Sequence, residues 1–127
     1  MSICAVLGLC SALTISGVAT VHDGDTIYVN HQTIRLWGVD AEELTEPNGP
    51  AARDFLQKII GVETVVCTTT GASHKRAVAK CSVRGRDLGQ TLIEAGAALD
   101  CGAYSRGHYR KAEPDGARSR LRQKPYC

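Results

Sequence analysis

The sequence predicts a mainly β protein with helices, of the α+β class, built as a five-stranded β-barrel of the OB type with two to three helices. Three observations predict this fold. Five short runs are rich in β-branched and apolar residues, glycine-containing turn strings separate them, and two segments have the apolar spacing of covering helices. Short strands joined by such turns are typical of a small closed barrel.

The chain has 127 residues, 43% hydrophobic and 22% charged, which is the size and composition of one ordinary globular domain. We expect this domain at 13–121, with an apolar leader at 1–12 and a tail at 122–127. The net charge of +2 says little about partners, but basic residues cluster late in the chain. This cluster either attracts polyanions or is a solvated helix face. It comprises Arg106, Arg110, Lys111, Arg118, Arg120, Arg122 and Lys124.

The leader lacks the basic start of a secretory signal, so we interpret it as a truncated signal-like segment. No charged residue occurs from Met1 to Val21, which is long enough to suggest a membrane span. Its second half is rich in Ser, Thr and Gly and is required for a first strand at Leu13–Val21. We therefore expect no stable membrane partner. The protein is expected to be secreted or periplasmic, and a tether through the leader stays open.

The next two strands form a hairpin around the polar turn Asn30-His31, over Thr26–Val29 and Thr33–Val39. Counting back from this turn places Thr26 opposite Arg35, so that Asp25 lies beside the arginine. The alternative is plain: DGD is a common turn string, and an aspartate beside a strand arginine is often a structural pair.

Carboxylates follow the hairpin directly, in the segment Asp40-Ala41-Glu42-Glu43. Oxygen ligands bind hard cations, and calcium accepts their loose geometry better than magnesium does. Hydrolysis of a phosphodiester needs a cation and guanidinium groups, because negative charge develops on the phosphate oxygens. A carboxylate not bound to metal is left to orient or deprotonate water. The open end of the hairpin, where Asp25 and the segment Asp40–Glu43 lie, is therefore the candidate site.

The later elements follow from helix and strand signals. Pro50 suits the first turn of a helix that Gly61 ends, and Asp87 with Gln90 resembles a capping box. We expect helices at Pro50–Ile60, Leu88–Ala95 and about Tyr104–Leu121, the last interrupted by Pro114 and Gly116, and strands at Glu63–Thr69 and Ala77–Val83 around a loop at Thr70–Lys75.

Six cysteines in so short a chain are typical of an exported domain with disulfides. If the two strands around the 70–75 loop pair about His74, Cys67 faces Cys81, which predicts a cross-strand disulfide. Cys101 and Cys127 are then expected to join the tail to the end of the second helix. A zinc site is the alternative, although the sequence has no CxxC motif.

Five strings follow one another along the chain: HDGDT, IRLWGVDAEE, NGPAARDFL, HKRAVAKC and DLGQTLIEAGAAL. In this order and at these spacings they resemble the staphylococcal nuclease (thermonuclease) family over about Ser16–Leu99. The resemblance implies an OB-type barrel and a calcium-dependent hydrolase, an endonuclease that cleaves DNA and RNA and leaves 3'-phosphates. It also implies the site: Asp25, Asp40 and the Ala41 carbonyl as calcium ligands, and Arg35, Glu43 and Arg76 as catalytic residues.

Two departures from the family pattern concern this site. The family's usual Asp-(Ala/Thr)-Pro-Glu becomes Asp40-Ala41-Glu42-Glu43, which removes a proline and adds a competing carboxylate. A tyrosine-containing segment before the second arginine becomes Ala72–Arg76, where His74 or Lys75 is expected to contact a substrate phosphate instead. Tyr104 and Tyr109 either stack on a base or pack with a wet hydroxyl.

Two other functions stay open beside the nuclease. Barrels of this type also bind oligonucleotides without cleaving them, so a catalytically weak or inactive OB-fold module that binds nucleic acid is the first alternative. A disulfide-stapled exported domain with no role on nucleic acids is the second. For the nuclease we expect DNA or RNA as substrate, Ca²⁺ as cofactor and a monomeric protein.

Overall fold

The long first strand organises the sheet. A computed structural model describes residues 13–127, so the leader expected at 1–12 lies outside the described residues. Strand β1 (Thr14–Asp23) pairs antiparallel with β2 (Thr26–Val29) on one side and with β5 (Thr64–Ser73) on the other. The chain therefore builds outward from β1 in both directions.

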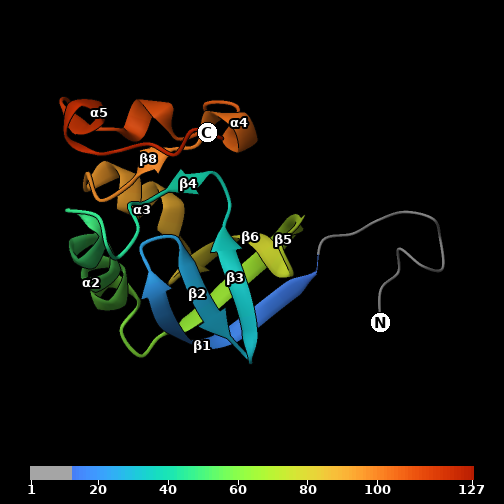
Figure 1. Ribbon diagram of the computed structural model, residues 1–127. Coiled ribbons are helices and arrows are strands. Elements are labelled where there is room, and N and C mark those ends of the chain that lie inside the picture. The colour runs from blue at the N-terminus through green and yellow to red at the C-terminus, as the bar shows by residue number, and fades with distance from the viewer. Residues whose placement is uncertain (1–12) are drawn as a thin grey trace.

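The barrel closes through one parallel pairing. Strand β3 (Gln32–Leu36) pairs antiparallel with β2, and β6 (Arg76–Val83) pairs antiparallel with β5. Strands β3 and β6 then pair with each other, which joins the two ends into a closed five-stranded barrel (Figure 1). A two-residue strand, β7 (Arg86–Asp87), extends the sheet from β6. The prediction of a five-stranded OB-type barrel is confirmed.

Two helices cover the barrel where the sequence predicts them. Helix α2 (Gly49–Ile60) has a proline in its first turn, ends at Gly61 and buries Ala52, Leu56 and Ile60 against the core next to β1. Helix α3 (Leu88–Glu94) begins after Asp87, whose carboxylate accepts a hydrogen bond from the Gly89 N–H. That side chain satisfies one of the free N–H groups of the first turn.

The prediction of a third helix, at about Tyr104–Leu121, is wrong. The structure has three short pieces there, α4 (Gly102–Ser105), the 3₁₀ helix η1 (Arg110–Ala112) and α5 (Ala117–Arg120). Positive φ angles at Arg106, Gly107 and Gly116 interrupt the chain between them. The segment winds around the buried Asp100, which accepts hydrogen bonds from the Ser105 hydroxyl and the Tyr109 N–H. Residues 13–127 thus hold four short or medium α-helices rather than two to three, and none is long and apolar enough to cross a membrane.

Two strand boundaries differ from the prediction as well. The expected strand 33–39 breaks at Gly38, which has φ 71° and lies against Ser105, and the chain continues as β4 (Val39–Asp40) paired with β8 (Leu99–Asp100). The expected loop 70–75 is mostly strand, because β5 runs on to Ser73 through a bulge near Thr70. The C-terminal helices α4 and α5 lie beyond β4 and β8 at one end of the barrel (Figure 1).

Gly49 fixes the acidic segment against the start of α2. A Cβ at this position would lie 1.8 Å from the carbonyl oxygen of Glu43, so backbone meets backbone there. We expect Gly49→Ala to lower the free energy of unfolding by about 3 kcal/mol in urea denaturation. The added methyl group would overlap the Glu43 carbonyl, so the backbone of the acidic segment or of the start of α2 would have to shift. Gly71→Ala is the control, because a Cβ there meets no atom within 4 Å. Equal unfolding midpoints for the two variants would contradict this account.

Candidate active site

The hairpin β2–β3 brings an aspartate and an arginine together, as its register predicts. Asn30 and His31 both have positive φ, 49° and 63°, which is the backbone of a tight two-residue hairpin turn. Thr26 lies opposite Arg35, and the Arg35 Nη2 lies 3.3 Å from the Asp25 Oδ2. The Arg35 Nη1 also donates to the Leu36 carbonyl at 2.9 Å. Only 11% of the arginine side chain is exposed, so its guanidinium is held in one place.

Asp25 also joins the hairpin to the acidic segment. Its Oδ2 accepts a hydrogen bond from the Ala41 N–H at 2.9 Å. Burial raises the pKa of the Asp25 carboxyl above its ordinary value; the Arg35 charge opposes this rise and the nearby Asp23 adds to it. Its Oδ1 accepts a hydrogen bond from the Thr26 hydroxyl at 3.3 Å, so both oxygens of Asp25 have partners within the protein.

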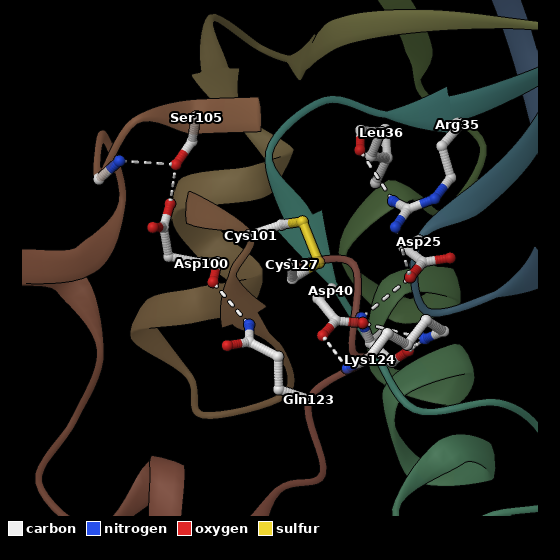
Figure 2. The surroundings of a disulfide bond; sticks show 12 residues. Asp25, Arg35, Leu36, Asp40, Asp100, Cys101, Ser105, Gln123, Lys124 and Cys127 are labelled. Atoms are coloured by element: carbon white, nitrogen blue, oxygen red, sulfur yellow. Dashed lines mark hydrogen bonds and ion pairs between the residues drawn. A yellow bond between two sulfur atoms is a disulfide. The ribbon is translucent and has the colours of Figure 1, made fainter. Parts of the chain in front are cut away.

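A lysine from the tail lies among the predicted metal ligands. The Lys124 ammonium donates to the Asp40 Oδ1 at 2.9 Å (Figure 2). It also donates to the Ala41 carbonyl at 2.5 Å and lies 3.5 Å from the Glu43 Oε1. The Lys124 backbone N–H donates to the other Asp40 oxygen at 2.9 Å. Burial would lower the pKa of Lys124, but the hydrogen bond to Asp40 and the charges of Asp25, Asp40 and Glu43 raise it. The ammonium therefore stays charged.

The oxygens of Asp25, Asp40 and the Ala41 carbonyl are of the kind that calcium prefers, two carboxylates and a backbone carbonyl. As they lie, however, they do not fit a calcium ion, because the Lys124 ammonium is bonded to two of the three groups. Within residues 13–127, no set of three or more His, Cys, Asp and Glu side chains is arranged to hold a metal. The donor set is suited to a cation, and the cation that occupies it belongs to the chain.

Closure of the barrel brings the two candidate arginines into one pocket. The parallel pairing sets Arg35 level with Val78, and Arg76 lies two residues earlier on the same face of β6. Arg35, Arg76 and Val78 line this pocket together with Ser73 and Tyr104. An anionic group entering it meets two guanidinium groups.

The other predicted residues divide between this pocket and the surface. Tyr104 lines the pocket and is 56% exposed, so its ring is accessible. His74 and Lys75 form the exposed turn between β5 and β6 and do not line it. Tyr109 is a packing residue, 1% exposed, with its hydroxyl bonded to Asp87. Glu43 keeps 55% of its side chain exposed beside Lys124.

Two tail residues of the site, Lys124 and Tyr126, were not predicted from the sequence. Tyr126 lines the arginine pocket. Burial would lower the pKa of Arg35, but the charge of Asp25 and the nearby Tyr126 hydroxyl raise it. The expected bond between Cys101 and Cys127, which is present in the structure, was the available signal, because it fixes the end of the tail beside β8. The other expected disulfide, between Cys67 and Cys81, joins facing residues of β5 and β6.

Glu42 does not compete for the cation, contrary to the interpretation from the sequence. It is 2% exposed, and its carboxylate is hydrogen bonded to Asn48 and Arg122 rather than to Lys124. Its oxygens accept hydrogen bonds from the backbone and side-chain N–H groups of Asn48, at 2.9 and 2.8 Å, and from the Arg122 N–H at 3.0 Å. Glu42 thus connects the start of α2 to the tail.

The hydrogen bonds to Glu42 make its contribution to stability depend on pH. Burial opposes ionisation, but the donors on Arg122 and Asn48 outweigh it, so the pKa of Glu42 is lowered. A lowered pKa stabilises the fold above the unfolded value, about 4.3, and this stabilisation is lost as pH falls through the folded value. We expect Glu42→Gln to lower the free energy of unfolding by about 2 kcal/mol at pH 7. Urea denaturation at pH 7 and pH 3 should show this difference shrinking at pH 3; a constant difference would contradict it.

A closed five-stranded barrel with two guanidinium groups in a pocket beside a carboxylate cluster defines an OB-type domain suited to an anionic ligand. The family model described as Staphylococcal nuclease homologue matches residues 33–122, and the chain belongs to this family. No curated protein matches the chain. The matched range includes Arg35, Asp40 and Arg76, whereas Asp25 and Lys124 lie outside it.

Proposed function

We propose that this chain is a nuclease that hydrolyses phosphodiester bonds of DNA or RNA. The observation that carries the proposal is the convergence of Arg35 and Arg76 on one pocket beside the carboxylates of Asp25, Asp40 and Glu43. Membership of a nuclease family supports a substrate of this class.

The chemistry assigned to these residues follows from where charge develops. Attack of water on phosphorus builds negative charge on the non-bridging oxygens, and Arg35 and Arg76 neutralise that charge from one pocket. The salt bridge to Asp25 and the bond to Leu36 hold Arg35 in place, so little reorganisation is needed during the reaction. Glu43, exposed beside the cluster, orients or deprotonates the water.

Calcium dependence, endonuclease cleavage and 3'-phosphate products are finer parts of the same proposal. The family is generally calcium-dependent. In this chain Asp25, Asp40 and the Ala41 carbonyl are the groups to bind the ion, and Lys124 has to leave two of them first. The roles given to Arg35, Arg76 and Glu43 therefore include no step in which calcium takes part.

The disulfides bear on where the protein is located. Two disulfides between described cysteines favour an oxidising compartment, so we propose a secreted or periplasmic protein. A monomer, without a stable membrane partner, stays our expectation.

The arginine and carboxylate assignments predict the effect of single substitutions on cleavage. We expect Arg35→Ala, Arg76→Ala and Glu43→Ala each to lower turnover about a hundredfold or more, because each removes a group that meets developing charge or the attacking water. The measurement is nicking of plasmid DNA and cleavage of single-stranded DNA and RNA, with Ca²⁺ and with a chelator. Arg53→Ala is the control, since Arg53 lies on α2 and pairs only with the neighbouring Asp54 among the described ion pairs. Equal residual activity in all variants would point to a contaminant or to another site.

The tail favours a second candidate, a module that binds nucleic acid without cleaving it. Lys124 lies in the carboxylate cluster and Tyr126 in the arginine pocket, where substrate and cation would bind in a nuclease. Retention on single-stranded DNA that weakens with salt, without cleavage under any metal condition, would favour this module over the nuclease.

A further inference from the structure

We propose that Lys124 is the resident cation of the carboxylate cluster and that the tail, residues 122–127, holds it there, so that calcium has to displace the lysine ammonium in order to bind. The site is the one assigned in the proposed function, but the inference concerns cation binding and does not require cleavage. Lys124 acts through the groups that it contacts, Asp40, the Ala41 carbonyl and Glu43, and is in this sense a positioning residue.

The burial of Asp40 explains why a cation is needed. Its side chain has no exposed surface, and Asp25 beside it is only 7% exposed. A carboxylate removed from water must be paired and hydrogen bonded. Lys124 supplies both its ammonium and its backbone N–H, one to each Asp40 oxygen. The lysine side chain is 16% exposed, so this is an enclosed pair and not a surface salt bridge.

The register of the tail delivers the lysine to this place. Glu42 accepts the N–H of Arg122, and Asp40 accepts the N–H of Lys124, so alternate residues of the two segments pair in antiparallel order. The Gln123 amide donates to the Asp100 carbonyl at 2.8 Å, and Cys127 is bonded to Cys101 (Figure 2). Anchors on both sides of Lys124 leave its ammonium little freedom to move away.

The same tail also reaches the arginine pocket. Tyr126 lines it beside Arg35 and packs edge-on against Tyr104, with ring centroids 6.5 Å apart. Calcium must therefore displace an ammonium, and a phosphate entering the pocket lies beside Tyr126 as well as the two arginines. The disulfide between Cys101 and Cys127 sets how easily this happens, because it closes the tail onto β8.

The test is calcium binding by the oxidised full chain, measured by isothermal titration calorimetry. We expect Lys124→Met, which keeps the bulk and removes the charge, to bind Ca²⁺ at least tenfold more tightly than the wild type. Lys111→Met is the matched control, because Lys111 is exposed and is not among the described ion-pair partners of Asp25, Asp40 and Glu43, and it should bind like the wild type. The pair Cys101→Ser with Cys127→Ser should also bind more tightly, since the tail is released. Equal affinity in wild type and Lys124→Met would overturn the proposal.

A second measurement uses the unsubstituted protein and so does not depend on a variant that folds. Acetylation with acetic anhydride, followed by mass spectrometry of peptides, compares the two lysine amines directly. Lys124 should react at least tenfold more slowly than Lys111, because its ammonium is bonded to Asp40 and Ala41. Equal rates would mean that the ammonium does not occupy the cluster. If the unsubstituted protein cleaves no nucleic acid but its Lys124 is protected from acetylation, the proposed nuclease activity is refuted and the inference about Lys124 is retained.

Discussion

The burial of the Asp40 carboxylate is the constraint on which the site depends. The side chain has no exposed surface, so its negative charge must meet a cation inside the protein. Asp25 and Glu43 add charge of the same sign close by, which strengthens the requirement. In this chain the requirement is met from the far end of the sequence, 84 residues away, by the ammonium and N–H of Lys124. The acidic segment and the tail are therefore one structural unit.

Barrel closure is the second requirement, because it produces the arginine pocket. Neither antiparallel hairpin alone brings Arg35 near Arg76; the parallel pairing of β3 with β6 does so. Asp25 then links the pocket to the cluster, since one carboxylate contacts the Arg35 guanidinium and accepts the Ala41 N–H. A change in the register of that pairing would separate the two arginines and leave the cluster intact. The two parts of the site thus depend on different interactions.

Local rules predicted what local geometry determines. A two-residue turn and a period of two residues suffice for the Asp25–Arg35 pair. The Cys67–Cys81 pairing holds because the bulge near Thr70 shifts the register by one residue between the His74-Lys75 turn and the cysteines. The helix at 104–121 failed because hydrogen bonds to Asp100 outweigh helical propensity in that segment. The expected Cys101–Cys127 bond indicates where the tail ends, but the position of the Lys124 ammonium follows from contacts between carboxylates and a tail with no regular structure, which the sequence does not show. Family membership is confirmed, yet the family match covers neither Asp25 nor residues 123–127.

Glu42 connects the departure from the family pattern to the behaviour of the site. Where the family usually has proline, this chain has a carboxylate that accepts the Arg122 N–H, two residues before Lys124. A proline has no side-chain acceptor, so it leaves Arg122 without this anchor and the tail free to take another path. The residue that looked like a competing ligand instead guides the competing cation into the cluster. The extra acid and the internal lysine are therefore best understood together, as two ends of one antiparallel contact that decides what the buried carboxylates bind.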